Sequence, residues 1–596
     1  MSGQVHSHGF ELEGSATRPV IRGRHLVVAC GHYLAALAGM RMRDLGGNAI
    51  DAGVAMAFAQ AVLEPQSYGF GGECPILIYA AHQGRVVAIN GNTRAPAAAT
   101  IEWFRERGMR LIPGDGFLPA GVPAAPDALI TALQYYGRLT LGEVLAPAIE
   151  LAAHGFPVYE GMRDGIAATA ERFRREWPSS AAIFLPGGRV PEVGETWRNP
   201  HLARTFERLV AAEHDSRHLG RHAALRAARE RFYRGDIARE IVAFQRETKV
   251  RDASGGESAG LLSEEDLASF ETRVETPVTI NYRGYDVYKC GPWSQGPVFL
   301  QQLALLEGFD LALLGQGSAD YIHVLVEAAK LAFADRERYY GDPQFVDVPL
   351  RGLLSKAYAA ERRALIDMRR ASLELRPGNP YPFEGREQGA DLRALYGRAG
   401  DAGTTGTRAI DAEGNMFSAT PSGGWLYGSP VIPDLGFCLG TRCQIFWLDP
   451  PDHPNALRPR KQPRTTLTPS LVLKDGRPYM VFGTPGIDNQ DQWTLQFFLN
   501  VVDFGMDLQD AIDAPAFHSV HFPRSFYPKR ASPGELVVEA RVPPGVREEL
   551  ERRGHVLTVV PGWSLNFTTA VAIDPQRGVI EGAASSRGER NYALGW

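Results

Sequence analysis

A threonine, Thr404, follows a glycine at the head of a predicted β-hairpin two-thirds of the way along the chain. Residues 407–411 and 416–420 have the composition of paired strands, and the Glu-Gly-Asn sequence between them is typical of a tight turn. If the Gly403–Thr404 peptide bond is cut, Thr404 acquires a free α-amine beside its own hydroxyl. Such an amine titrates near ~7.7–8.0 and can act as general base for the hydroxyl. A Gly-Thr-Thr sequence before a hairpin is usually only a turn, so on these residues alone the ordinary turn is the preferred interpretation.

Size and charge limit the kind of protein that this hairpin belongs to. A chain of 596 residues exceeds one ordinary core, so we expect two domains or one large layered α/β unit. Hydrophobic residues make up 44% and charged residues 22%, an ordinary soluble composition. The formal net charge of −5 gives no electrostatic reason to expect nucleic acid or an anionic membrane as partner, so the expected substrate is a small molecule. No stretch approaches the ~18 apolar residues that a membrane span requires.

The start of the chain and the cysteines favour a cytoplasmic protein. The first residues lack a basic region followed by an apolar core, so no secretory signal is expected. The cysteines are few, odd in number and scattered, which predicts free, reduced thiols. Cys438 and Cys443 lie close in sequence but lack the two-pair spacing of a zinc site. The five are Cys30, Cys74, Cys290, Cys438 and Cys443.

Hydrophobic periodicity predicts an α/β chain whose second part is richer in strands. Residues 120–245 are predicted to be mostly helical, and residues 377–403, rich in Gly, Pro, Arg and Glu, to form an exposed segment before the proposed cut. Other predicted helices are 32–45, 49–62 with Asn48 as cap, 320–339 and 490–502, and Ser263 begins a capping box. Predicted strands are 25–30, 75–80, 85–90, 278–282, 285–289, 467–473, 479–482, 535–539, 556–560 and 569–573.

Two loops carry residue types that suit catalysis or binding. Arg94 lies just after a predicted strand and could bind a substrate carboxylate in a bidentate fork. On its position alone, a surface or structural arginine is the preferred interpretation. The Gly-Thr-Pro-Gly turn that ends at Gly486 precedes a predicted helix, and its backbone N–H groups suit an oxyanion. An ordinary turn between strand and helix explains the same residues.

Two further patterns are read as structural. The glycine-rich residues 67–72 lie between a helix and a strand, whereas a phosphate-binding loop lies between a strand and a helix. His214, His218 and His222 have the spacing of one helix face, so a metal site is conceivable. No carboxylate in a recognised ligand motif accompanies them and Gly220 weakens the helix, so a solvated histidine face is favoured.

Motifs along nearly the whole chain together resemble the gamma-glutamyltransferase family, a branch of the N-terminal-nucleophile hydrolases. Each piece is short, but the pieces occur in the family's order. The matching segments are 46–52, 67–72, 94–96, 327–335, 341–343, Thr404-Thr405, 411–415, 463–469, 483–486 and 582–584.

This resemblance implies a four-layer αββα sandwich, made as an inactive precursor. The precursor would cut itself before Thr404 into fragments 1–403 and 404–596, which stay together as a heterodimer. Thr404 would attack an amide carbonyl, form an acyl-enzyme and pass the acyl group to water or an amine. No metal or organic cofactor is implied. By motif position, Gly486 and Ile487 donate the oxyanion-hole N–H groups, Ser422 supports Thr404, and Thr465 and Thr466 contact the substrate.

The chain departs from the family's pattern where the glutamyl head group binds. Asn92 stands where an arginine grips the α-carboxylate, and Arg94 could replace that arginine from a shifted loop. Near Gln444, where an acidic residue pairs with the α-ammonium, no carboxylate is present, and such a buried ammonium without a partner would cost several kcal/mol. Ile487 also replaces a second glycine, which narrows the pocket, and Gly424 replaces a polar residue.

Because of these departures the expected substrate is a small carboxylate-bearing amide of unsettled class. It is either a γ-glutamyl compound or the amide of an acid without an α-amine, as in the oxamate amidohydrolases of the same family. Hydrolysis is favoured over transpeptidation. The alternative from another class is an unprocessed, inactive homologue that serves as a binding protein.

Overall fold

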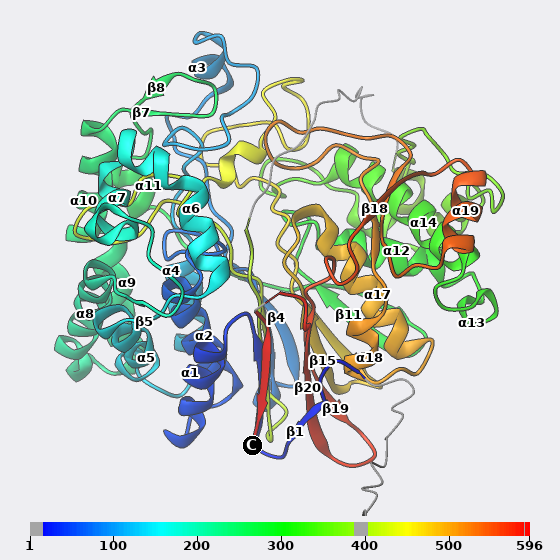
Figure 1. Cartoon of the computed structure of the whole chain (residues 1–596), viewed down its shortest axis with the longest axis horizontal. Helices are drawn as coiled ribbons and strands as arrows, with labels where there is room; N and C mark the ends of the chain where they lie inside the picture. Colours follow the sequence, from blue (N-terminus) through cyan, green and yellow to red (C-terminus); the bar gives the residue numbers. More distant parts are fainter. Residues whose placement is uncertain (1–15, 387–402, 589) are drawn as a thin grey trace, which may run out of the picture.

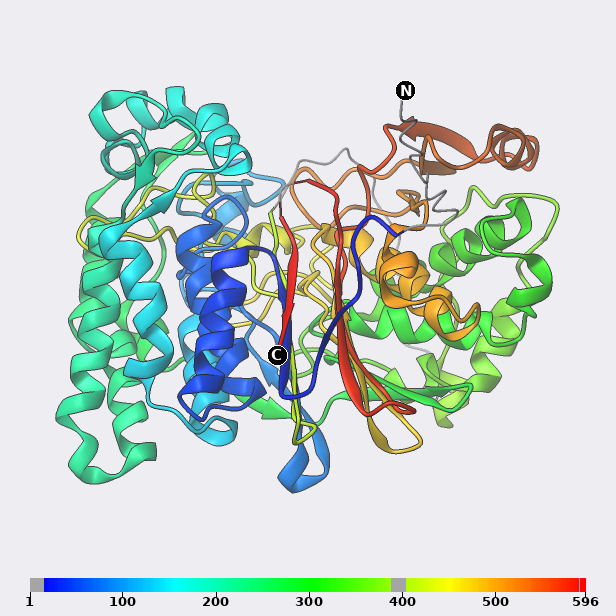
Figure 2. The same ribbon diagram turned by 60° about the horizontal axis from the view of Figure 1, so that its bottom comes forward.

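Two seven-stranded sheets lie face to face at the centre of the molecule, and helices cover both outer faces (Figure 2). The structure is a computed structural model that describes residues 16–386, 403–588 and 590–596. The sequence prediction for residues 377–403 therefore lies largely outside the described residues, as does that for the first 15. The four layers confirm the predicted αββα sandwich.

The first sheet has the order β21-β2-β12-β13-β3-β4-β9, and all its neighbours are antiparallel. Strand β12 begins three residues after Thr404 and lies between β2 and β13. The strands are β2 (Leu26–Cys30), β3 (Ile76–Ala80), β4 (Arg85–Asn90), β9 (Arg273–Glu275), β12 (Thr407–Asp411), β13 (Met416–Ala419) and β21 (Tyr592–Gly595).

The second sheet has the order β1-β20-β19-β15-β14-β11-β10, again entirely antiparallel. In both sheets, strands from before and after residue 403 pair with one another. The strands are β1 (Ile21–Gly23), β10 (Val278–Tyr282), β11 (Tyr285–Lys289), β14 (Ser470–Lys474), β15 (Arg477–Gly483), β19 (Thr569–Asp574) and β20 (Val579–Ala584).

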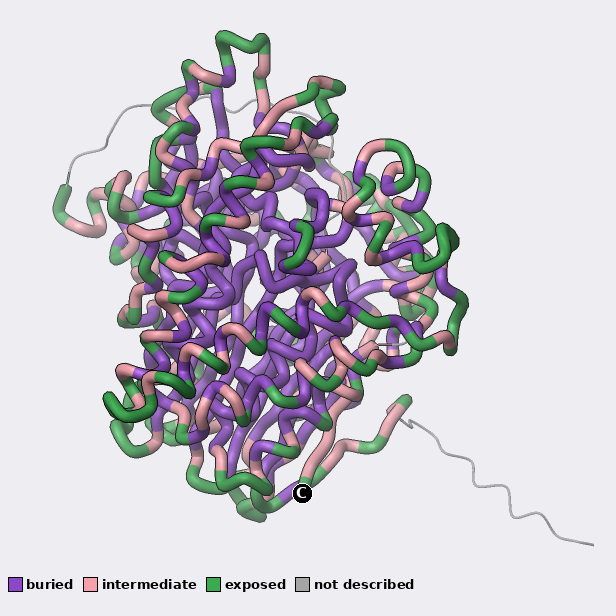
Figure 3. Tube along the Cα trace, turned by 90° about the vertical axis from the view of Figure 1, so that its left-hand side faces the viewer, coloured by how far each residue is buried: buried purple, intermediate pink, exposed green. Residues whose placement is uncertain are grey.

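Side-chain alternation along the strands divides the core into layers. In β2, Val28 and Cys30 belong to the core shared with the first helical layer, whereas Val27 and Ala29 belong to the core between the sheets. Because every second residue faces each way, both faces of β2 must be apolar, and all five residues of this strand are buried. Buried residues therefore run through the middle of the molecule, and exposed ones concentrate at its periphery (Figure 3).

The first helical layer packs on the first sheet, at the left of Figure 1. Its central helix α2 is alanine-rich and wholly buried, and Asn48 caps it through a reciprocal capping box with Asp51. The helices around this layer are α1 (Tyr33–Asp44), α2 (Ala49–Leu63), α3 (Ile101–Arg105), α4 (Ala125–Tyr136), α5 (Leu141–His154), α6 (Glu160–Arg175), α7 (Pro178–Phe184), α8 (Pro200–Asp215), α9 (Arg221–Tyr233), α10 (Asp236–Glu247) and α11 (Glu264–Ala268).

The second helical layer packs on the second sheet, with α14 and α17 against α12 and the strands (Figure 1). A small separate sheet, β16 (Phe517–Ser519), β17 (Glu535–Glu539) and β18 (Val556–Val560), extends this side. The helices on this side of the molecule are α12 (Gly296–Leu306), α13 (Leu311–Leu314), α14 (Ala319–Tyr339), α15 (Leu350–Leu353), α16 (Lys356–Arg363), α17 (Gln490–Val502), α18 (Leu508–Asp513) and α19 (Pro544–Arg552).

Most predicted elements are confirmed, but the prediction that His214, His218 and His222 share one helix is wrong. Helix α8 ends at Asp215, a 3-10 turn follows, and α9 begins only after Gly220, whose φ of 89° breaks the helix. His214, His218 and His222 are all exposed, in agreement with the solvated interpretation.

Two other properties concern the whole chain. All five cysteines are free, as the sequence predicts, and the structure shows that all five are buried. Within the described residues, no helix combines the length and the apolar character needed to cross a membrane.

Buried histidines predict that acid destabilises the fold. Burial, with Arg524 nearby, lowers the pKa of His518 to about 3. Because this folded-state pKa lies below the unfolded value of about 6.5, the unfolded chain binds more protons below pH 6.5. Stability is therefore full above pH 6.5 and falls as the pH drops toward 3. Between pH 7 and 5 this one group contributes a loss of about 2 kcal/mol.

His518→Gln should make the pH-dependent loss smaller by that amount in urea unfolding of the full chain at pH 7 and pH 5. The matched control is His82→Gln, because His82 is exposed. Equal pH dependence in the two variants would contradict the assignment.

Candidate active site

Thr404 lines a cavity of about 390 Å³ and lies shortly before β12. In the intact chain it is 5% exposed, and a bridge pairs its backbone with that of Ser422. Gly486 lines the same cavity, so the structure brings together Thr404 and one of the proposed oxyanion donors. The other lining residues are Glu64, Ser67, Tyr159, Glu160, Gly161, Asp164, Gly403, Thr405, Pro485, Trp493, Phe567, Arg587, Gly588, Arg590 and Asn591.

The carbonyl oxygen of Gly403 is the most heavily hydrogen-bonded atom at this position. It accepts hydrogen bonds from Ser422 Oγ at 2.7 Å, from Trp425 Nε1 at 2.7 Å and from Thr404 Oγ at 2.8 Å. The Gly403 N–H donates to Tyr427 Oη at 2.6 Å. Gly403 is therefore held through both its N–H and its carbonyl oxygen, mainly by side chains 19 to 24 positions further along the chain.

Ser422 is fixed by a buried ion pair. Its Oγ lies 3.2 Å from Thr404 Oγ and accepts a hydrogen bond from Arg442 Nη2 at 2.8 Å. Arg442 Nε donates to Glu73 at 2.9 Å, and both side chains are 1% exposed. Burial raises the pKa of the Glu73 carboxyl, while Arg442 opposes this effect. The structure thus places Ser422 beside Thr404, as the family resemblance implies.

The glycine-rich loop at residues 67–72 allows this arrangement because it packs directly on the backbone around Ser422. A Cβ atom at Gly72 would lie 2.2 Å from the Ser422 carbonyl oxygen, and one at Gly69 would lie 2.3 Å from that of Gly424. Any side chain there would force the two segments apart. The loop's role is close backbone packing, in agreement with the rejection of phosphate binding.

Thr405 is held by the end of α2. Its Oγ1 donates to Glu64 at 3.0 Å and accepts from Gln60 Nε2 at 2.8 Å. Gln60 also accepts from Thr407 at 2.6 Å, which ties the start of β12 to the helix. Burial raises the pKa of the Glu64 carboxyl against the lowering effects of Arg590, Gln60 and Thr405.

Gly486 and Ile487 form the turn that faces Thr404 from the second sheet. Gly486 has a φ of 133°, and a Cβ there would lie 2.3 Å from the Trp493 ring. Ile487 keeps a positive φ of 56° and packs with Trp425 and Phe526. Within the described part of the chain, neither backbone N–H donates to another protein group. N–H groups without a protein acceptor are available to donate to an oxyanion, and of these two residues Gly486 lines the cavity with Thr404.

The four proposed substrate contacts do not line the cavity in the intact chain. The backbone N–H of Thr465 donates a hydrogen bond to the Trp293 carbonyl oxygen. The buried hydroxyl of Thr466 has no hydrogen-bond partner among the described residues. The amide of Gln444 donates to the Gly114 carbonyl at 2.8 Å and accepts from the Tyr527 N–H at 3.3 Å.

The Arg94 side chain is held by residues in and just after helix α11. Its Nη2 donates to Ser269 Oγ at 2.9 Å and to the Asp266 carbonyl at 3.2 Å, and its guanidinium lies over the Phe270 ring. These contacts correspond to the structural interpretation that the sequence favoured on position alone.

The cations that do line the cavity are Arg587 and Arg590, near the end of the chain. Arg587 is fully buried and pairs with Glu539 at 3.3 Å. Arg590 is 37% exposed, donates to Ser67 Oγ and lies 3.8 Å from Glu64. Arg590 is therefore the cavity cation that remains partly accessible.

Sequence reasoning missed Trp425, Arg442 and Arg590. Their roles depend on contacts between segments that are far apart in the chain, such as Arg442 with Glu73 and Arg590 with Glu64. A weak signal exists at Glu64, because a carboxylate at the end of an otherwise apolar, buried helix needs partners.

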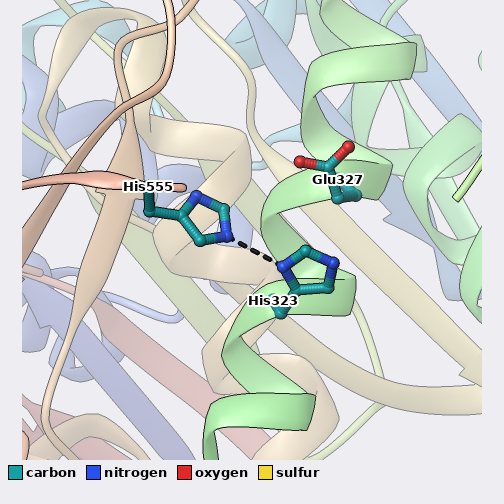
Figure 4. Close-up of side chains that lie close together, drawn as sticks. All are labelled: His323, Glu327 and His555. Atoms are coloured by element: carbon teal, nitrogen blue, oxygen red, sulfur yellow. Dashed lines mark hydrogen bonds between the residues drawn. The ribbon is translucent and has the colours of Figure 1, made fainter. Parts of the chain in front are cut away.

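A separate cluster of His323, Glu327 and His555 has ligand atoms within 4.8 Å of one another (Figure 4). However, His323 Nδ1 and His555 Nε2 are hydrogen-bonded to each other at 2.8 Å. Glu327 already accepts from Lys330 at 2.7 Å and from Arg376 at 3.3 Å. Two cations on the only carboxylate of the cluster disfavour a divalent metal, so we interpret it as a hydrogen-bond network of the core.

The buried pair of Glu73 and Arg442 yields a testable prediction. Glu73→Gln removes the counter-charge of a buried guanidinium and should destabilise the chain by about 3–5 kcal/mol. Urea unfolding in a Thr404→Ala background, which keeps the chain intact, measures this change. The control is Glu150→Gln in the exposed pair with Arg41, where less than about 1 kcal/mol is expected. Similar losses in both variants would show that the pair does not hold the site.

Comparisons of the sequence and of the structure with known proteins point to the same family. The sequence profile described as Gamma-glutamyltranspeptidase matches residues 35–595. The chain is 33% identical over 532 residues to "Glutathione hydrolase proenzyme" of Pseudomonas sp. (strain A14), covering 87% of this chain and 85% of that protein.

Two solved structures extend this finding. "Structure of LmbA2991HD" shares 46% identity with a TM-score of 0.92, covering 98% of this chain and 100% of that one. "Crystal structure of cephalosporin acylase from Bacillus halodurans" shares 31% identity with a TM-score of 0.82, covering 100% of this chain and 99% of that one. The chain therefore belongs to the gamma-glutamyltranspeptidase family.

Proposed function

We propose that the chain is a precursor that cleaves itself between Gly403 and Thr404 and then works as an amidohydrolase or acyltransferase with Thr404 as nucleophile. The observation that carries this proposal is the position of Thr404. Its hydroxyl lies at a cavity that Gly486 also lines, and Ser422 lies 3.2 Å from it. The word "proenzyme" in the name of the glutathione hydrolase relative supports a cleaved, active form.

In the proposed reaction the new α-amine of Thr404 takes the hydroxyl proton. Thr404 Oγ attacks the amide carbonyl of the substrate, and the N–H groups of Gly486 and Ile487 stabilise the negative oxygen that develops. The amine part of the substrate leaves with the proton, and the acyl group stays on Thr404. Water, or an amine acceptor, then takes the acyl group. Arg442 holds Ser422 in place beside the nucleophile.

The proposed substrate is a small amide that carries a carboxylate. Arg590 is the partly exposed cation of the cavity and can pair with that carboxylate in place of its contact with Glu64. Arg94 stays the alternative, but it would have to leave Ser269 and Asp266. Thr465 and Thr466 remain candidate contacts, because the Thr466 hydroxyl has no partner in the described part of the chain. Gln444 would reach a substrate only by releasing Gly114 and Tyr527.

The class of acid stays open between a γ-glutamyl group and an acid without an α-amine. The similar proteins include one named a glutathione hydrolase and one named a cephalosporin acylase. A cation in the cavity suits the carboxylate of either class. The absence of a carboxylate at Gln444, where the family resemblance implies the partner of the α-ammonium, favours the acid without an α-amine. Glu64, Glu160 and Asp164 line the cavity and keep the γ-glutamyl class as the alternative. The second candidate function, an uncleaved binding protein, would use the same cavity without Thr404 chemistry.

Self-cleavage is tested with Thr404→Ala. The wild-type chain should appear as two fragments in denaturing electrophoresis, and the small fragment should begin with Thr404. The variant should remain one chain of 65.2 kDa, because it has no hydroxyl to attack Gly403. The control is Thr405→Ala, which alters the neighbouring hydroxyl and should still be cleaved. A wild-type chain that stays intact while it hydrolyses amides would overturn the proposal.

The carboxylate contact is tested by comparing Arg590→Gln with Arg94→Gln on simple dicarboxylic monoamides. Loss of an ion pair with a bound carboxylate should raise KM at least tenfold for Arg590→Gln, and less than threefold for Arg94→Gln. A substrate of equal size without the carboxylate should show no difference between the variants. The reverse pattern would assign the role to Arg94, and efficient turnover of a γ-glutamyl anilide that needs its α-amine would contradict the preferred acid class.

A further inference from the structure

The carbonyl oxygen of Gly403 belongs to the bond that must break, and it lies in a donor cradle separate from the Gly486–Ile487 turn. Besides Thr404 Oγ, which is the proposed nucleophile, two side-chain donors converge on it, Ser422 Oγ and Trp425 Nε1, each at 2.7 Å. Donors at 2.7–3.1 Å from a carbonyl oxygen stabilise the negative charge that develops when the carbonyl is attacked. The two donors come from residues 18 and 21 positions after Thr404 and share no backbone element with the Gly486 turn.

The indole of Trp425 is held rigidly enough to act as such a donor. It is 2% exposed and stacks on Tyr427 with ring centroids 5.5 Å apart. The Arg442 guanidinium lies over its face at 5.3 Å, and Phe526 packs beside it. A dry, fixed donor strengthens the interaction with a developing charge, because no water competes for it and it need not reorient.

The second donor is oriented by its own partner. Arg442 Nη2 donates to Ser422 Oγ at 2.8 Å, so the Ser422 proton points elsewhere, toward Gly403. The positive guanidinium also makes Ser422 a poorer base and a stronger donor. Ser422 therefore stabilises charge on the Gly403 oxygen instead of removing the Thr404 proton.

The geometry points to Trp425, together with Ser422, as the oxyanion-stabilising site for self-cleavage at Gly403–Thr404, distinct from the site proposed for substrate turnover. This inference rests on the proposed function only in that the chain cleaves itself. Thr404 Oγ bonds to the Gly403 carbonyl carbon, and the carbonyl electron pair moves to the oxygen between Ser422 and Trp425. The intermediate collapses, the C–N bond breaks, and the hydroxyl proton ends on the Thr404 nitrogen. Water then hydrolyses the ester and leaves a Gly403 carboxylate and the free hydroxyl.

Trp425 also remains satisfied after the cut. Its Nε1 lies 2.9 Å from the Ser67 carbonyl oxygen, so one N–H is shared between Ser67 and Gly403. When the Gly403 end departs, the bond to Ser67 persists and no buried donor loses its partner. The same N–H therefore serves the precursor without destabilising the mature protein.

The experiment measures the rate of self-cleavage of the freshly synthesised full chain by denaturing electrophoresis and intact mass. Trp425→Phe should slow the cleavage about 10- to 100-fold, because one of the donors is lost and Ser422 remains. The matched control is Trp177→Phe, since Trp177 is fully buried and its Nε1 has no partner among the described residues. The control should cleave within threefold of wild type.

Two further measurements separate chemistry from folding. Both tryptophan substitutions are placed in a Thr404→Ala background, and their Tm values are compared. If Trp425→Phe lowers Tm much further than the control, 3-benzothienylalanine at position 425 replaces it, because this residue keeps the indole shape and lacks the N–H. Hydroxylamine, which captures the ester, should not restore the rate of the variant, because ester formation is the slowed step.

Cleavage of the benzothienylalanine chain within threefold of wild type would overturn the inference, as would rescue by hydroxylamine. Neither readout uses a substrate. A wild-type chain that never cuts at Gly403–Thr404 would instead refute the proposed function itself.

Discussion

The buried ion pair between Arg442 and Glu73 is the interaction on which the arrangement around Thr404 depends. A guanidinium with 1% exposure needs a counter-charge and acceptors for its donors. Glu73 accepts from Arg442 Nε and Ser422 accepts from Nη2, whereas Nη1 has no hydrogen-bond partner among the described residues. The same guanidinium lies over Trp425 and Phe526. Through these contacts one cation sets the positions of Ser422 and Trp425, which in turn hold the Gly403 carbonyl. A uniformly apolar core would not direct these hydrogen-bond donors to one atom.

The sandwich supplies the second constraint. Thr404 is delivered by β12, an interior strand of the first sheet, whereas the Gly486 turn is delivered by the end of β15 in the second sheet. The apolar layer between the sheets, with Val27 and Val481 among its members, fixes the spacing of the two strands. Thr404, the proposed nucleophile, and the Gly486 turn therefore lie at one end of the interface between the sheets.

Local patterns allowed much of the fold to be predicted. Helix α17 and strands β10, β11 and β17 agree with the predicted bounds, because periodicity and flanking turns act over a few residues. The pairing of Arg442 with Glu73 spans 369 positions, and nothing in either local sequence announces it. The position of Arg94 shows the same limit, since the sequence gives its place after a strand but not the Asp266 and Ser269 partners that hold it. Motif order identified Thr404 and Gly486 as candidates, but the surrounding donors required coordinates.

The mixed origin of the strands bears on what the proposed cut would leave behind. Strand β2 lies between β12 and β21, and β14 pairs with β11, so segments from both sides of residue 403 are woven into each sheet. Neither segment alone would contain a complete hydrophobic core. Cutting one peptide bond in such a fold leaves nearly every noncovalent contact intact. We therefore expect the two polypeptides to unfold together in one cooperative transition. The fold can therefore tolerate the proposed cut at one end of the interface between the sheets, because strand pairing and packing, and not chain continuity, hold the two polypeptides together.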